Sequence, residues 1–228
     1  MRRVAISQSN YIPWIGYFEL ISSVSDFVFL DNVQYTPRDW RNRNQIKTPH
    51  GKLWLTINVK LHGDLNLIQE YYFVDTNWKS RHLEAIRRNY KRSKFFNSIF
   101  PEIEGMYHSY EGTSLSRFNQ HLIYNISKRL GLATRFHNAA DFTTSKIPSQ
   151  RLLEICISLQ ATTYVSGPSA RNYLDLTIFQ DKDISTEWFE YSRKEYPQLW
   201  GNFQRNVSVL DPILNNGWGT LNLIKGNI

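Results

Sequence analysis

The sequence contains a single cysteine, and this scarcity excludes two kinds of site at once. One thiol cannot form an internal disulfide, and it leaves no thiol cluster for zinc. Cys156 lies in "RLLEICISLQA", where apolar residues recur at helical spacing. This pattern predicts a buried core thiol rather than a nucleophile.

Long apolar runs are also missing. No run approaches the roughly 20 residues that a membrane-spanning helix requires. The first residues, "MRRVAISQSNYIPW", turn polar at Ser7 before the core of a signal peptide could form. We therefore expect no membrane span and a cytoplasmic location.

The usual signatures of metal, nucleotide and hydrolase sites do not occur either. The six histidines form no H-x-x-x-H or H-E-x-x-H pair, so histidine alone predicts no metal site. There is no G-x-G-x-x-G, no Walker lysine and no G-x-S-x-G elbow. We therefore expect no metal and no bound cofactor.

The order of apolar segments predicts the fold class. A short apolar run at residues 4–6 leads into a polar loop, then into "PWIGYFELISSVS" with Pro13 in the first turn of a helix, and then into "DFVFLD". Strand, loop, helix and strand within about 30 residues form the pattern of a parallel βαβ unit. The chain is therefore expected to have a Rossmann-like α/β fold with a mostly parallel sheet, as one domain over residues 1–228.

Further elements follow from periodicity. Strands are predicted at residues 53–59, 69–74, 162–167 and 184–191, and helices at residues 147–161 and from Thr113 or Ser114 to Gly131. Residues 78–110 have a helical pattern that we expect to break at Pro101. A basic helical insert is predicted near residues 76–145, and the chain after Tyr191 is expected to be loop-rich.

Positive charge is in excess and clustered. The net charge is +7, and residues 36–52 carry five Lys or Arg against one acid, Asp39. Residues 76–94 carry seven against Glu84. This clustering favours an anionic partner, such as a phosphate, a nucleotide or a nucleic acid, over a merely soluble basic surface.

Polar segments follow three of the predicted strands, at the sheet edge where open α/β folds bind ligands. After the first strand come Gln8, Asn10 and Tyr11, and after the strand at 162–167 the chain reads "SGPSARNY", with Ser166 and Gly167 allowing close backbone approach. We treat these five residues as candidates for substrate binding, with Asn10 also a candidate donor to a developing charge. A capping loop and an ordinary turn are the plain alternatives.

The segment "DNVQYTPRDWRNRNQIK" at residues 31–47 has the composition of a site. Asp31 directly follows four apolar residues, so its carboxylate is expected at a strand end, partly desolvated and able to act as a base. The other candidates in this segment are substrate-binding groups: Gln34, Tyr35, Arg38, Trp40, Arg41, Asn42, Arg43, Asn44 and Lys47. We expect Asn10, Asp31 and the arginines to surround one shared hollow. His82, on a partly apolar helical face, is the second candidate base, with a satisfied core histidine as its alternative.

The stretches "QSNYIPWIGYFELI", "FVFLDNVQYTPRDWRNRNQIKTPHGKLWLTINV", "TTYVSGPSARNYL" and "EYPQLWGNF" resemble, in order and spacing, the WbqC-like protein family. The resemblance implies a bacterial protein encoded with genes for O-antigen and other surface polysaccharides. It further implies transfer of an acyl or aminoacyl group, glycyl being one such group, to the amine of a nucleotide-linked amino sugar. An activated acyl or aminoacyl donor would be the second substrate, aminoacyl-tRNA being one kind.

The transfer hypothesis gives each candidate a role. An amine that attacks an activated carbonyl needs a base, either Asp31 or His82, and donors for the oxyanion or sugar, here Asn10, Asn42 and Asn44. Phosphates of the substrates would be held by Arg38, Arg41, Arg43 and Lys47. Two alternatives remain open: a nucleic-acid-binding module without catalysis, and an adenylyl-transfer enzyme.

Overall fold

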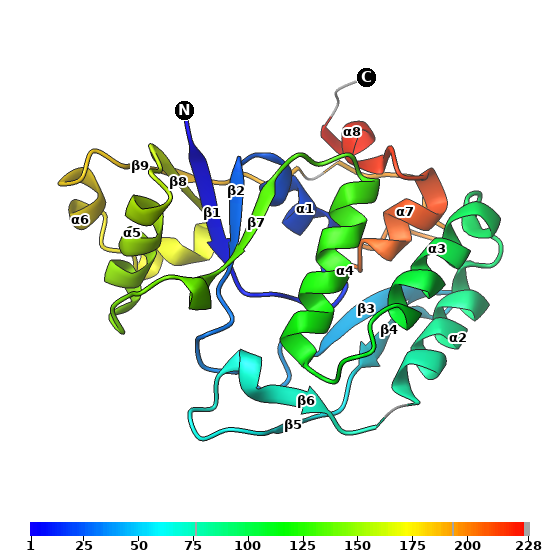
Figure 1. The fold of residues 1–228 in the computed structure, drawn as a ribbon. Helices are drawn as coiled ribbons and strands as arrows, with labels where there is room; N and C mark the ends of the chain where they lie inside the picture. Colours follow the sequence, from blue (N-terminus) through cyan, green and yellow to red (C-terminus); the bar gives the residue numbers. More distant parts are fainter. Residues whose placement is uncertain (76, 193, 226–228) are drawn as a thin grey trace.

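A five-stranded parallel sheet forms the centre of the computed structural model, which describes residues 1–75, 77–192 and 194–225 (Figure 1). Its strands run in the order β7-β2-β1-β8-β9. Their bounds are β1 Arg3–Ser7, β2 Asp26–Phe29, β7 Arg135–Asn138, β8 Thr163–Ser166 and β9 Ser185–Trp188. All four pairings are parallel, which confirms the predicted Rossmann-like α/β fold.

Alternation along the strands separates two apolar cores. Ala5 and Phe27 point to the face covered by α1 (Ile15–Ser22) and α4 (Leu115–Arg129), whereas Val4 and Val28 point to the face covered by α5 (Pro148–Ser158) and α6 (Thr177–Gln180). Figure 1 shows α5 and α6 on the left of the sheet and α4 on its right. Cys156 is fully buried in the α5 core, and burial raises the pKa of its thiol to about 12, which agrees with a core role.

The chain starts at the central strand β1, builds outward to β2 and β7, and then returns to β8 and β9 on the other side of β1. The connections after β1 and β8 therefore diverge at the carboxyl ends of two adjacent strands. Such a switch point is where open parallel sheets form a ligand crevice. The predicted polar segments after β1, β2 and β8 all lie at this edge of the sheet.

Two hairpins lie beyond that edge: β3 (Arg43–Thr48) with β4 (Gly51–Thr56), and β5 (Val59–Leu61) with β6 (Tyr71–Phe73). The predicted strand at 53–59 is divided between the two hairpins. β3 was not predicted, because its buried positions include the polar residues Asn44 and Lys47 and the sequence shows no apolar alternation.

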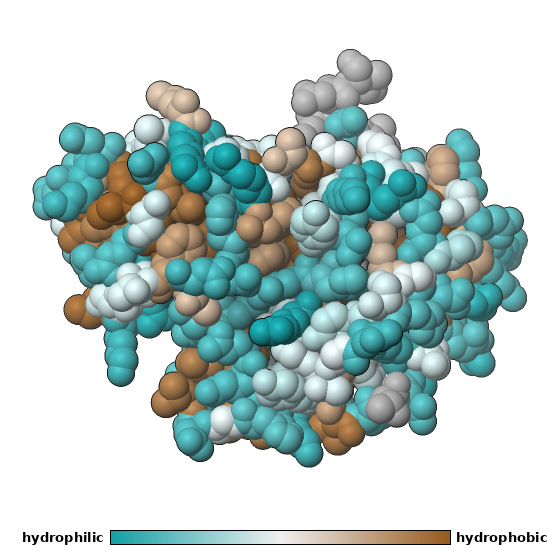
Figure 2. Space-filling view, viewed as in Figure 1, coloured by the Kyte–Doolittle hydropathy of each residue, from teal (hydrophilic) through white to brown (hydrophobic). Residues whose placement is uncertain are grey.

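Residues 76–145 contain α2 (Trp78–Tyr90), α3 (Phe96–His108) and α4, but they also supply β7 to the main sheet. The helical break expected at Pro101 occurs earlier, at residues 91–95, where the hydroxyl and backbone N–H of Ser93 both donate to the Tyr90 carbonyl. Pro101 lies inside α3 with its side chain exposed. Figure 2 shows hydrophilic side chains covering much of the surface over these helices.

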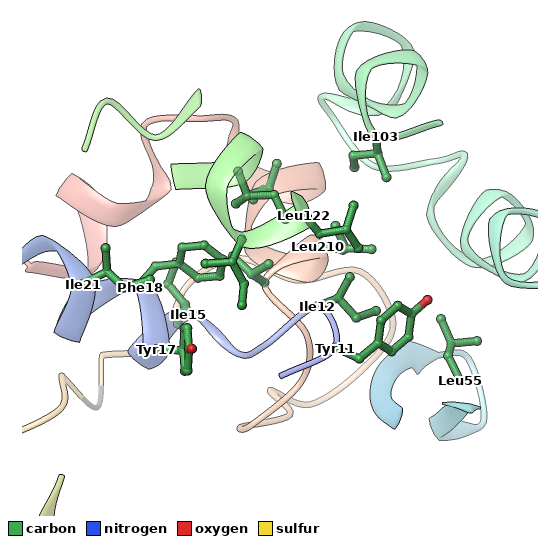
Figure 3. Packing of buried hydrophobic residues seen from close by; sticks show 14 of the residues in the cluster. Tyr11, Ile12, Ile15, Tyr17, Phe18, Ile21, Leu55, Ile103, Leu122 and Leu210 are labelled. Carbon is green, nitrogen blue, oxygen red and sulfur yellow. The ribbon is translucent and has the colours of Figure 1, made fainter. Parts of the chain in front are cut away.

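The chain after Tyr191 ends in two helices that were not predicted, α7 (Leu210–Asn216) and α8 (Thr220–Lys225). Their buried residues join the α1 and α4 core, where Figure 3 shows Leu210 close to Leu122 and Ile12. The described part of the chain also contains three short 3-10 turns: Ile68–Glu70, Ala139–Asp141 and Pro168–Asn172. Within the described residues, every helix is too short or too polar to cross a lipid bilayer.

Candidate functional site

Arg41 joins the polar segment after β1 to the segment after β2. Its guanidinium donates to Gln8 Oε1 and Asn10 Oδ1, and it lies 3.4 Å from Asp39 Oδ2. Its side chain is only 12% exposed. Burial lowers the pKa of Arg41, and Asp39, Tyr17 and Asp31 oppose this effect, so the guanidinium is a cation held by two amide oxygens and the Asp39 carboxylate. Two of the three predicted polar segments are therefore in direct contact.

Asp31 lies two residues beyond the end of β2 and is 4% exposed. Oδ1 accepts a hydrogen bond of 2.8 Å from the Ser9 backbone N–H, and Oδ2 accepts one of 2.8 Å from Nε2 of Gln120 on α4. Burial raises the pKa of Asp31, although both hydrogen bonds and the Arg41 charge act against it. The result is a positioned carboxylate with more basic character than an exposed aspartate.

Asp31 lines a cleft of about 860 Å³ between the ends of β2 and β7 and the start of α4. Two further carboxylates, Glu70 and Asp141, line the same cleft, against a single cation, Arg117. The remaining walls carry hydroxyls and amides, among them Tyr72, Thr113, Ser114, Ser116, Gln69 and Asn138. We call this the acidic cleft, and its charge suits a ligand that carries an amine.

A second cleft, of about 770 Å³, opens beyond the ends of β8 and β9. Its walls combine the aromatic side chains Trp14, Phe189, Tyr191, Tyr196 and Phe203 with the cations Arg171, Lys194 and Arg205. We call this the aromatic cleft. Ser166 ends β8, and Gly167 follows it, directly before Pro168 in the wall of this cleft.

The shared hollow that we expected from the sequence is divided in the structure. Asp31 lines the acidic cleft, whereas Asn10 lines a small cavity of about 250 Å³ together with Trp14, Trp40 and Asn206. The division arises because the Arg41 side chain fills the space next to Asn10 and Gln8. The two segments are nevertheless in contact, because Ser9, the residue before Asn10, donates its backbone N–H to Asp31.

The model of the WbqC-like protein family matches residues 8–222, which is nearly the whole chain. The chain belongs to the WbqC-like protein family. This WbqC-like protein is also 42% identical over 219 residues to a protein of Mycobacterium tuberculosis that is named "Uncharacterized protein Rv1507c", with 95% of each chain covered. No solved structure matches the chain. The resemblance carried by the four quoted stretches is therefore confirmed.

Several predicted site residues of this WbqC-like chain lie in its interior. The Asn42 amide donates to the Ile57 carbonyl at 2.9 Å, and the Asn44 amide donates to the Tyr11 and Ile12 carbonyls at 3.1 and 2.9 Å. The Asn44 bonds anchor the hairpin β3–β4 to the loop after β1, and the Asn42 bond joins the two ends of that hairpin. Their predicted role as donors to a substrate stays a prediction, and their amide N–H groups already have backbone partners.

His82 occupies a closed aromatic cluster. Its Nε2 lies 3.2 Å from the Thr56 carbonyl and donates to it, so Nδ1 accepts from the Tyr11 hydroxyl at 2.8 Å. The Tyr11 hydroxyl also bonds the Tyr107 hydroxyl at 2.6 Å. Burial lowers the pKa of His82 to about 4, so the ring is neutral at pH 7. Both ring nitrogens have partners, and His82 is absent from the walls of the acidic and aromatic clefts.

The cations of residues 38–47 point to different surroundings. Arg38 is exposed, and its backbone has a positive φ of 59°. The Arg43 guanidinium lies 4.2 Å above the centre of the Trp54 ring, and Lys47 is buried near Asp211. Only Arg41 reaches the candidate site. Their joint role in binding phosphate stays a prediction.

The aromatic and amide candidates of this segment are spread in the same way. Trp40 lies 5.5 Å from Trp54, ring centre to ring centre, and Tyr35 stacks 3.8 Å from Tyr71. Gln34 is exposed and forms a β-bridge with Leu67. Of these three candidates, only Trp40 lines a described cavity, the small one beside Asn10.

The basic helix α2 carries acidic partners. Arg88 pairs with Glu84 at 2.7 Å, and Arg87 pairs with Glu104 at 3.0 Å. These exposed pairs neutralise part of the positive patch that the sequence suggested for a nucleic acid.

Sequence reasoning missed the groups that complete each cleft. Gln120, Glu70 and Asp141 come from three separate elements, and no spacing in the sequence relates them to Asp31. Among residues 1–75, 77–192 and 194–225, no three His, Cys, Asp or Glu side chains gather closely enough to hold a metal ion. The acidic cleft is therefore lined by separated carboxylates.

Proposed function

We propose that this WbqC-like protein transfers an acyl or aminoacyl group, such as glycyl, to the amine of a nucleotide-linked amino sugar used for surface polysaccharides. The observation that carries the proposal is Asp31, a buried carboxylate held by Ser9 and Gln120 in the wall of an open cleft. The family resemblance supplies the class of substrates. Asp31 is the group at this edge of the sheet that fits a general base.

In the proposed step, the neutral amine of the sugar attacks the carbonyl carbon of the activated acyl donor. The new C–N bond forms, and the bond between the carbonyl carbon and the leaving group breaks, with the electron pair departing on the leaving group. The proton released from the nitrogen passes to the Asp31 carboxylate. The hydrogen bonds from Ser9 and Gln120 fix the orientation of that carboxylate before the substrate arrives.

The charge of the acidic cleft supports the same assignment. Glu70 and Asp141 attract an amine, which is mostly protonated in water at neutral pH, and a raised Asp31 pKa strengthens its ability to accept the proton. His82 fits the role of base less well, because its nitrogens already bond Tyr11 and Thr56. The proposal therefore assigns the base to Asp31 alone.

The test is a transfer assay read by mass spectrometry. Nucleotide-linked amino sugars are incubated with the protein and with glycyl-tRNA, glycyl adenylate or a glycyl thioester as the donor. We expect one combination to yield the N-glycyl sugar nucleotide. Asp31→Asn should lower the rate by about 10²–10⁴-fold, the usual contribution of a general base. Asp181→Asn, which alters an exposed acid beyond α6, should keep the wild-type rate.

Two results would overturn the proposal. If no donor adds an acyl group to any amino sugar, the reaction class is wrong. If the product forms and Asp31→Asn forms it at the wild-type rate, the assignment of the base is wrong.

A further inference from the structure

The aromatic cleft has no role in the transfer chemistry described above, yet its composition is unusual for an open surface. Trp14 from the loop after β1 lies 4.9 Å from Tyr191, ring centre to ring centre, and Phe189 lies 4.9 Å from the same tyrosine. These rings are only partly buried and face a cleft of about 770 Å³. Partly exposed aromatic rings grouped in a concave surface typically mark a binding site for a flat or apolar group.

Cations surround these rings. Arg171 comes from the turn after β8, while Lys194 and Arg205 come from the long connection after β9. One carboxylate, Glu190, lines the same cleft. The Arg205 guanidinium also contacts Glu195 at 3.6 Å, but both side chains are more than half exposed, so this pair is weak and free to rearrange.

The position of the cleft in the fold gives an independent reason to expect a ligand. It lies beyond the carboxyl ends of β8 and β9 and against the start of α1, at the point where the chain connections diverge on the two sides of β1. Gly167 allows the Tyr191 side chain to pack closely against the end of β8, because a Cβ at this position would lie 3.3 Å from the Tyr191 hydroxyl. The sheet edge, the turn after β8 and the aromatic rings thus form one concave wall.

The geometry points to a nucleoside diphosphate as the ligand of the aromatic cleft. The base would stack on Tyr191 and Trp14, and the diphosphate would be bound by Arg171 and Arg205. This inference rests on the proposed function, because the sugar nucleotide proposed there is the reason to choose a nucleoside diphosphate over other anions. It places the nucleotide part of the sugar nucleotide away from the arginines of residues 38–47.

Shared walls connect this cleft to the candidate site. Trp14 and Asn206 line both the aromatic cleft and the small cavity that holds Asn10. The next residue toward the N-terminus, Ser9, donates to Asp31. A sugar linked to a diphosphate in the aromatic cleft would therefore extend toward Asn10 and the Arg41 side chain that bonds it.

Calorimetric titration of the full chain with UDP, GDP, CDP and dTDP tests the inference, with the matching nucleosides and inorganic pyrophosphate as comparison ligands. We expect at least one nucleoside diphosphate to bind, and to bind better than pyrophosphate or its own nucleoside. Arg171→Ala combined with Arg205→Ala should weaken that binding about tenfold or more, because charge-assisted hydrogen bonds to phosphate are lost. Tyr191→Leu should weaken it about fivefold or more through lost stacking.

Matched controls separate these effects from changes in folding or charge. Lys60→Ala combined with Lys182→Ala removes two exposed cations outside the cleft, and Tyr124→Leu removes an exposed ring on α4. Both controls should bind the nucleotide as the wild type does. Thermal unfolding of each variant shows whether it remains folded, and a destabilised Tyr191→Leu is replaced by Trp14→Leu, which removes the other stacking ring.

The outcomes distinguish this inference from the proposed function. Nucleotide binding that survives Asp31→Asn and is lost with the two arginines supports the inference, even where no acyl transfer is detected. Absence of binding to every nucleoside diphosphate overturns it. Equal affinity for pyrophosphate, or unchanged affinity in the cleft variants, also overturns it, including where transfer activity is intact.

Discussion

Asp31 and His82 are both buried titratable groups, but their surroundings give them different possibilities. His82 packs against Tyr11 and Trp78, and both of its nitrogens already have partners. Asp31 has one side in the protein and the other in the acidic cleft. At the scale of single residues, access to a cleft separates a candidate base from a core histidine better than burial does.

Gln120 offers a direct test of how the pKa of Asp31 is set. Its amide donates to Asp31 and thereby lowers the pKa of the carboxyl, against the effect of burial. Gln120→Leu should raise that pKa, because the ionised form loses a donor. The acid limb of the kcat/KM profile should then move to higher pH.

Gln150→Leu is the matched control for this change, since Gln150 contacts Glu154 on α5 and lies outside the acidic cleft. Its pH profile should coincide with that of the wild type. An acid limb that moves to lower pH in Gln120→Leu would contradict the assignment.

Single residues also show what the sequence could predict. Asp31 was predicted at a strand end because it directly follows a run of apolar residues, and its position there is confirmed by the fold. Asn42 and Asn44 looked similar in composition, yet their amides bond backbone carbonyls. A polar side chain in a sequence does not reveal whether its partner is a ligand or the chain itself.

At the scale of elements, one carboxylate connects the amino-terminal part of the chain to two strands. Asp26, at the start of β2, accepts hydrogen bonds from Arg2 before β1 and from Arg135 and His137 of β7. Burial alone would raise the pKa of Asp26, but these donors outweigh it and hold the pKa well below its usual range. Asp26 is therefore ionised over the whole physiological range.

Asp26→Asn should lower the free energy of unfolding at pH 7 by about 1–3 kcal/mol, since Arg2 and Arg135 lose their charged partner. A lowered folded-state pKa gives stability that is present above the unfolded pKa of about 4 and is lost as the pH falls further. Denaturant unfolding at pH 7 and at pH 2 should therefore show a difference from the wild type that shrinks in acid. A difference of the same size at both pH values would contradict the ion-pair account.

A glycine in α1 connects that helix to the aromatic cleft. A Cβ on Gly16 would clash with the Trp14 ring, so Gly16→Ala should displace the indole and weaken nucleotide binding, measured by the same titration. Gly105→Ala in α3 is the control, because a Cβ there meets no atom within 4 Å. This control should bind the nucleotide normally. Its free energy of unfolding should be about 0.5–1 kcal/mol higher than that of the wild type, since alanine favours the helical conformation. Normal binding by Gly16→Ala would mean that the position of Trp14 does not matter.

The strands β3 and β7 could not be predicted, because their sequences show no periodic pattern of apolar residues. β3 buries asparagine and lysine, and β7 reads "RFHN", with Asp26 satisfying its arginine and histidine. Tertiary partners stabilise both strands, and those partners are distant in the sequence. The βαβ unit at the start of the chain was predictable because its apolar runs are local.

At the scale of the whole molecule, two clefts of different charge lie along one edge of one sheet. The strand pattern allowed the sheet and its ligand edge to be predicted. The clefts themselves could not be predicted, because each is closed by distant segments: the acidic cleft by α4 and the turn at 68–70, and the aromatic cleft by residues 189–192 and 194–207. No periodicity marks those contacts.

The pH dependence of global stability should reflect a second buried acid. Asp211 in α7 accepts a 2.8 Å hydrogen bond from the Tyr90 hydroxyl, and burial raises its pKa to about 6 despite that bond. The folded state then holds a proton that the unfolded state releases, so the free energy of unfolding should fall as the pH rises from about 4 to 6. Asp211→Asn should remove this decline in chemical unfolding measured across that range. An unchanged slope in the variant would contradict the assignment to Asp211.

The buried position of Cys156 has a practical consequence for studying both clefts. With its thiol enclosed in the α5 core and the pKa raised to about 12, the native chain should not react with maleimides. A cysteine introduced on the rim of either cleft would then be the single attachment point for a fluorescent dye. Pairs of such labels would allow the spacing of the two clefts to be followed by energy transfer while substrates bind.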